Sequence, residues 1–170
     1  FNIVDEFTDV TPDKFESFAR DACQLRIKDL FEEDSVDFDI EQALSNLPYE
    51  EEAIKLGVEQ TKLYKNILEY EKKNDVDLGV SPLYKFFLSY WSKSHDLILN
   101  DEIADYLNNT KDWNTRYENY KYSLLFKIRI GRGSSGIQKY YAGWSTFVKL
   151  ANGNIRYLME LVYRSYYLYL

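Results

Sequence analysis

Residues that cross-link proteins or bind transition metals are almost missing from this 170-residue sequence, which has one cysteine, Cys23, and one histidine, His95. A single cysteine excludes an internal disulfide, and the lack of a Cys/His cluster excludes a structural zinc site. We expect a reducing, cytoplasmic setting for such a chain. Cys23 is predicted to be a buried helix residue. His95 has no catalytic partner at a meaningful spacing and is predicted to be a surface or half-buried residue.

Glycine and proline are also scarce, with seven and three copies. That is too few for the many tight turns of an all-β fold, and the apolar residues recur mostly at helical spacing. We therefore predict a mainly α fold, a multi-helix bundle in which only Phe1 to Val4 resembles the end of a strand. No apolar run approaches the roughly 20 residues of a membrane-spanning helix, so no membrane contact is expected.

Positive charge is in deficit, because 21 Lys and Arg face 28 Asp and Glu and the net charge is -7. This balance opposes nonspecific binding to nucleic acid, which is therefore a disfavoured partner. The last third of the chain is locally basic, so a nucleic-acid contact through Lys121 to Lys149 stays open as a weaker hypothesis. The 16 tyrosines are expected mainly to fill spaces between helices. The acidic runs at 32–34 and 50–52 are expected on solvated faces, without a catalytic role.

Helix boundaries are marked by residues that cap or open helices. Starts are predicted at Pro12 after Thr8 or Thr11, at Asp39, at Ser81-Pro82, at Asn100 or Asp101, and at Asn154. Two further helical segments are predicted from spacing alone. One or two amphipathic helices with a Glu/Lys-rich solvent face follow Tyr49, and Asn114 to Ile130 is interpreted as one long helix rather than a strand.

The loop from Gly131 to Gly136 could be mistaken for a phosphate-binding loop. A P-loop needs Gly-x-x-x-x-Gly-Lys-Ser/Thr between a strand and a helix, and this loop lacks the lysine. We interpret it as a connection between helices. Its neighbours Arg129, Arg132 and Lys139 are candidates for a contact with an anion or a nucleic-acid backbone.

The turn Gly153-Asn154-Ile155-Arg156 is the one segment suited to phosphate. A helix N-terminus carries unpaired N–H groups and partial positive charge, and an arginine in the first turn adds a planar fork of donors. Spacing alone favours a purely structural alternative: Asn154 caps a core helix, and Arg156 pairs with Glu160, which can also pair with Arg164.

A family resemblance favours the phosphate-binding interpretation. Tyr140-Tyr141-Ala142-Gly143-Trp144, followed by the segment from Leu150 to Leu158, resembles the sensor-2 region in the helical lid of AAA+ ATPases, especially bacterial ATPases related to the origin-recognition proteins. The resemblance implies that the Gly-Asn-x-Arg turn begins the third lid helix and that Arg156, with Asn154 and Gly153, senses the terminal phosphate of a nucleotide. The segment from Phe15 to Lys28 resembles the helix that follows the last strands of the ATPase core.

The same resemblance implies a division into a possible core remnant (1–31), a helical insertion or linker region (32–112) and a lid-like segment (113–170). The sequence has no Walker A segment and no recognisable Walker B segment. We therefore expect ATP to bind the intact parent protein and not this chain alone, with the ATPase core of that polypeptide as the partner. The missing initiator methionine and the apolar C-terminal end suggest a fragment.

The leading hypothesis is thus the nucleotide-sensing lid region of an AAA+ ATPase, which moves with ATP binding and is not catalytic alone. The alternative is a self-standing helical module that recognises a protein partner through its aromatic-rich surface. A contiguous exposed patch of Tyr, Trp and Phe would favour the alternative.

Overall fold

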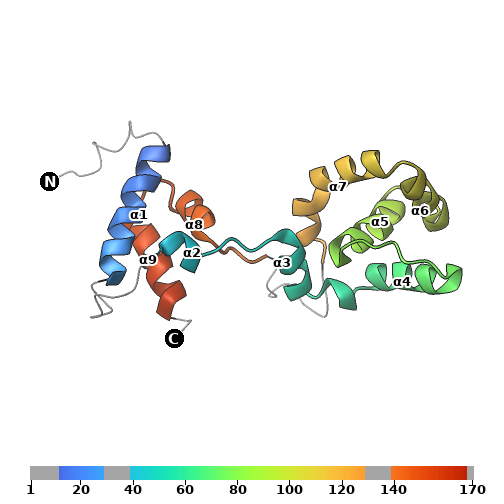
Figure 1. The fold of residues 1–170 in the computed structure, drawn as a ribbon, viewed down its shortest axis with the longest axis horizontal. Helices are drawn as coiled ribbons and strands as arrows, with labels where there is room; N and C mark the ends of the chain where they lie inside the picture. The colour runs from blue at the N-terminus through green and yellow to red at the C-terminus, as the bar shows by residue number, and fades with distance from the viewer. Residues whose placement is uncertain (1–11, 29–38, 129–138, 168–170) are drawn as a thin grey trace. The chain divides into compact units, whose positions relative to one another are not determined.

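The computed structural model describes residues 12–28, 39–128 and 139–167, and within these ranges it is helical without strands (Figure 1). The prediction of a mainly α bundle is confirmed, while Phe1 to Val4 lies outside the described residues. The chain forms two compact units, residues 1–47 with 141–170 (unit 1) and residues 48–140 (unit 2). Each unit has its own apolar core. The division into core remnant, insertion and lid stays a prediction.

Unit 1 brings together the two ends of the sequence. It consists of α1 (Pro12–Lys28), α2 (Ile40–Ala43), α8 (Trp144–Ala151) and α9 (Ile155–Tyr167). Four residues of α1 at a spacing of four positions turn one face inward, and they pack with residues of α2, α8 and α9. The core contains Phe15, Ala19, Cys23, Ile27, Ile40, Trp144, Phe147, Ala151, Leu158 and Val162. The predicted burial of Cys23 is confirmed, and burial raises the pKa of its thiol to about 11.

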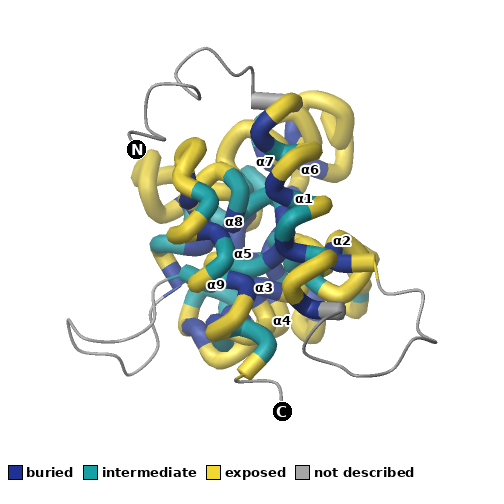
Figure 2. Tube along the Cα trace, turned by 90° about the vertical axis from the view of Figure 1, so that its left-hand side faces the viewer, coloured by how far each residue is buried: buried dark blue, intermediate teal, exposed yellow. Residues whose placement is uncertain are grey.

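Unit 2 is built around one central helix. In chain order it consists of α3 (Tyr49–Lys55), the 3-10 helix η1 (Val58–Gln60), α4 (Lys62–Asn74), α5 (Pro82–Ser94), α6 (Leu99–Asn108) and α7 (Thr110–Leu125). α5 packs against α3, α4, α6 and α7, and seven of its residues are buried. Buried and exposed stretches alternate along the described helices, as amphipathic packing requires (Figure 2).

Residues that cap or open helices predict the observed starts of α1, α2, α5 and α9 but miss others, including α4, where the Thr61 hydroxyl accepts a hydrogen bond from the Tyr64 N–H at 3.2 Å. The Asp39 carboxylate accepts a hydrogen bond from the Glu41 N–H at 2.8 Å, and the Ser81 hydroxyl accepts one from the Tyr84 N–H at 3.2 Å. The predicted cap at Asn100 or Asp101 is wrong, because α6 begins at Leu99 after Ile98, whose side chain makes no capping bond. The helix predicted for residues 114–130 also ends earlier than expected, since α7 (Thr110–Leu125) stops at Leu125.

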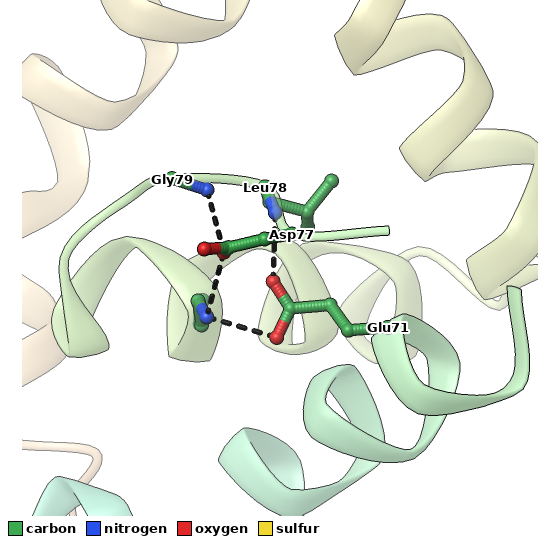
Figure 3. Close-up of polar contacts among 5 residues, drawn as sticks. Glu71, Asp77, Leu78 and Gly79 are labelled. Atoms are coloured by element: carbon green, nitrogen blue, oxygen red, sulfur yellow. Dashed lines mark hydrogen bonds and ion pairs between the residues drawn. The ribbon is translucent and has the colours of Figure 1, made fainter. Parts of the chain in front are cut away.

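The expected solvated acidic faces are wrong at two positions, Glu52 and Glu71, which are 1% and 9% exposed. Glu71 closes the α4–α5 connection: its carboxylate accepts hydrogen bonds from the Leu78 N–H at 2.9 Å and from Lys85 Nζ at 2.8 Å (Figure 3). Asp77 accepts from the Gly79 N–H at 2.9 Å, and this bond and the Lys85 charge lower the pKa of Asp77. Buried carboxylates are tolerated when paired and hydrogen-bonded in this way.

Candidate functional site

The turn between α8 and α9 reverses the chain within two residues. Asn152 and Gly153 have φ values of 45° and 79°, both in the left-handed region, which glycine and asparagine adopt most readily. The Asn154 N–H then donates to the Ala151 carbonyl at 2.9 Å. The chain therefore turns at Asn152 and Gly153, and Asn154 leads directly into α9.

Asn154 is the N-cap of α9. Its side-chain oxygen accepts a hydrogen bond from the Tyr157 N–H at 3.1 Å, which satisfies one of the free donors of the first turn. Buried Leu158 and Val162 fix the other side of the helix in the unit 1 core. The direction of the first turn is thus set by a local cap and by packing together.

Arg156 is the second residue of α9 and is exposed to solvent. In the part of the chain that the structure describes, its guanidinium has neither an ion-pair nor a hydrogen-bond partner. Glu160, the partner offered by the purely structural alternative, instead accepts from Arg164 Nε at 2.6 Å. The described residues therefore leave the donor fork of Arg156 available to a ligand.

The residues around Gly143 and Trp144, which belong to the motif that resembles the AAA+ lid, have a structural function at the start of α8. Gly143 has a φ of 98°, and a β-carbon at this position would lie 2.7 Å from the Asn46 Cα. The Trp144 N–H donates to the Leu44 carbonyl at 2.8 Å, and the Ser145 hydroxyl donates to Asn46 Oδ1 at 2.9 Å. Glycine at position 143 therefore allows the start of α8 to approach the segment after α2.

Of the three remaining candidates for anion contact, only Lys139 is among the described residues. Arg129 and Arg132 lie outside the described residues. Lys139 belongs to unit 2, where its Nζ lies 2.9 Å from Glu52 Oε2, and its side chain is 8% exposed. The Lys139 ammonium also lies 5.0 Å from the centroid of the Tyr122 ring. An anion contact at these three residues stays a prediction.

Sequence reasoning missed a second arginine, Arg116, whose guanidinium carbon lies 4.9 Å from the ring centroid of Trp113 and 5.4 Å from that of Trp91. The signal was present, because Trp113 and Arg116 are three residues apart in a helical segment and so lie on one face.

Among the described residues, no group of three or more His, Cys, Asp or Glu could hold a metal ion. In the same ranges, no helix is long and apolar enough to cross a membrane.

Comparison with known proteins gives one family. The model of the family described as ORC-CDC6-like matches residues 1–170. Searches of curated proteins and of solved structures found no significant match. The match covers the whole sequence, so both units lie within it.

Proposed function

The chain belongs to the ORC-CDC6-like family, and from this premise we propose that α8 and α9 of unit 1, which lie in the lid-like segment 113–170, serve in the nucleotide-sensing helical lid of an AAA+ ATPase. Arg156 is the sensing residue, and Asn154 and Gly153 set its position. The ATPase core of the intact polypeptide supplies the nucleotide site. The observation that carries the proposal is the exposed guanidinium of Arg156 at the first turn of α9, without an acidic partner among the described residues.

The donor set at this turn fits a phosphate group. A guanidinium offers several N–H donors in a planar fork and is always charged near neutral pH. The N-terminus of α9 adds partial positive charge on the same side. Bound ATP would supply the terminal phosphate whose negative charge this end of the helix recognises. The chain lacks Walker A and Walker B segments, so in this proposal it contributes sensing rather than hydrolysis.

Sensing requires a difference in affinity between two states. An arginine that contacts the terminal phosphate in only one arrangement of lid and core gives ATP a stronger hold on that arrangement. When the terminal phosphate is lost, the contact with Arg156 is lost too, and the nucleotide no longer favours that arrangement of lid and core. Movement of the lid with the nucleotide state is therefore the function proposed for the part of unit 1 that contains α8 and α9.

Replacement of Arg156 by alanine in the full-length protein tests this proposal. Arg164→Ala is a matched control, because Arg164 is also an exposed arginine of α9 but is engaged by Glu160. Hydrogen bonds to charged groups contribute roughly 1.5–3 kcal/mol, so ATP turnover of the Arg156→Ala protein should fall about tenfold or more. Turnover of the control should stay close to wild type. Equal turnover of both variants would contradict the sensing function.

A protein-recognition function is the second candidate, and one observation favours it. Unit 2 carries a partly exposed cluster of Trp, Tyr, His and Arg side chains on α5 and α7. A lid role for unit 1 and a recognition role for unit 2 are compatible, since the two units have separate cores.

A further inference from the structure

Arg116 is held in place by two indole rings. The guanidinium carbon lies within 6 Å of the Trp113 and Trp91 centroids, at 4.9 and 5.4 Å, which is the range of favourable cation–π contact. Trp113 is fully buried, and its Nε1–H donates to an Asp105 carboxylate oxygen at 2.8 Å. A fixed ring thus fixes the orientation of the arginine that lies on it.

The contacts with the rings leave the N–H donors of Arg116 unused. No ion pair and no hydrogen bond of its guanidinium occurs within residues 12–28, 39–128 and 139–167. Asp105 is near enough for Arg116 to help lower the pKa of its carboxyl, but the larger causes are the hydrogen bonds from Trp113 and Asn109. These two donors, at 2.8 and 2.6 Å, occupy both carboxylate oxygens of Asp105.

Two further aromatic side chains pack on Trp91, one of the two rings that contact Arg116. His95 is exposed and stacks on Trp91 with ring centroids 4.2 Å apart, and Tyr120, which is 41% exposed, meets Trp91 at 5.4 Å. We call Trp91, His95, Arg116 and Tyr120 the aromatic–arginine patch; buried Trp113 supports Arg116 and is not itself part of the surface. Tryptophan, tyrosine and arginine are the residues most enriched at the energetic centres of protein interfaces.

We infer that the aromatic–arginine patch binds an acidic segment of a protein partner, whose carboxylate is received by the donor fork of Arg116 while the surrounding rings contact the adjacent apolar atoms. Stacked guanidinium groups bind planar carboxylates bidentately, and the fixed orientation reduces the entropy lost on binding.

The charges near the patch oppose any densely charged anion as the occupant, and they oppose a nucleic acid more strongly than a peptide with one carboxylate at Arg116. Asp105 and the exposed Asp112, four residues before Arg116 on α7, add negative charge near the patch. The whole chain carries a net charge of -7. A polyanionic backbone needs several clustered cations, whereas one carboxylate needs one donor fork. The inference concerns unit 2 alone and does not depend on nucleotide sensing by unit 1.

An array of immobilised 12-residue peptides tests the inference on the full chain. Each peptide combines Asp or Glu with Leu, Phe or Trp, and each has a counterpart with Asn or Gln in place of the acids; mixed-sequence duplex DNA forms a separate arm. We expect acidic peptides to be captured and their amide counterparts not. Arg116→Gln should lower the affinity for the captured peptides by about tenfold to a hundredfold.

Two further variants separate binding from folding. Arg116→Lys keeps the charge and the aliphatic stem but lacks the planar fork, so it should lose most of the binding while its thermal melting stays near wild type. Lys93→Gln removes an exposed cation two residues from Trp91, on the opposite side of α5, and should bind normally. The inference is overturned if no acidic peptide binds, if amide peptides bind equally, if Arg116→Gln behaves as Lys93→Gln, or if only DNA is captured.

Discussion

At the scale of single residues, Glu52 is the clearest organiser of unit 2. Its two carboxylate oxygens accept hydrogen bonds from the Tyr140 N–H at 2.8 Å and from Lys139 Nζ at 2.9 Å. The Lys139 ammonium also lies 5.7 Å from the Tyr49 ring centroid. One buried acid on α3 thereby holds the residues with which unit 2 ends.

Loss of this carboxylate should strongly destabilise unit 2. Glu52→Ala removes the buried carboxylate that pairs with the ammonium of Lys139, and breaking a buried ion pair on one side costs about 3–5 kcal/mol. Chemical denaturation followed by amide exchange in residues 48–140 measures the loss. Glu51→Ala, at the exposed neighbouring position, should change the free energy of unfolding by no more than about 0.5 kcal/mol. Similar losses in the two variants would show that the pair is not important for stability.

The burial of single charged residues is also the feature that the sequence predicts least well. The adjacent acids at positions 50–52 indicate a solvated face, and only the fold shows that the third is buried, because its partner Lys139 lies 87 residues away in the sequence. Arg156 could be singled out, since the turn, the cap and the arginine are all adjacent in sequence. Long-range pairing of charges leaves no comparable local signal.

At the scale of secondary structure, several boundaries with a local chemical cause could be predicted, although the Thr61 cap of α4 was missed. Asp39, Ser81 and Asn154 cap their helices with their own side chains. The start of α6 at Leu99 has no such cap, so a sequence search for capping residues finds Asn100 and Asp101 instead. Tertiary packing, which is absent from a local pattern, decides such ends.

Two glycines of unit 1 allow a matched test of the α8 boundaries. Both have positive φ, but a β-carbon at Gly143 would meet the Asn46 backbone, whereas at Gly153 it would meet nothing within 4 Å. Gly153→Ala should therefore cost about 1–2 kcal/mol from backbone strain alone. Gly143→Ala should cost roughly 2–5 kcal/mol, because overpacking adds to the strain.

Amide exchange of α8 and α9 in the full chain reports both losses. A Gly143→Ala protein no less stable than Gly153→Ala would mean that the approach of α8 to the segment after α2 is not tight. The comparison also checks the structural function assigned to the motif at residues 140–144, independently of any nucleotide.

At the scale of the whole molecule, the helical class follows from composition, but the grouping of elements does not. Scarce glycine and proline with helical spacing predict an α protein. Nothing local predicts that residues 1–47 share a unit with residues 141–170, because this depends on pairings such as the Trp144 N–H with the Leu44 carbonyl. The match of a family model to residues 1–170 agrees with the resemblance first detected in the short segments around positions 140–158.

Discrimination between ATP and ADP by the full-length protein tests the central claim most directly. Equilibrium binding of each nucleotide is measured for wild type, Arg156→Ala and the control Arg164→Ala, at one fixed salt concentration. If Arg156 contacts the terminal phosphate, Arg156→Ala should lower the affinity for ATP by about tenfold or more and leave the affinity for ADP nearly unchanged. The preference for ATP over ADP should therefore be lost in Arg156→Ala and kept in Arg164→Ala. An unchanged ratio of ATP to ADP affinity in Arg156→Ala would contradict the account.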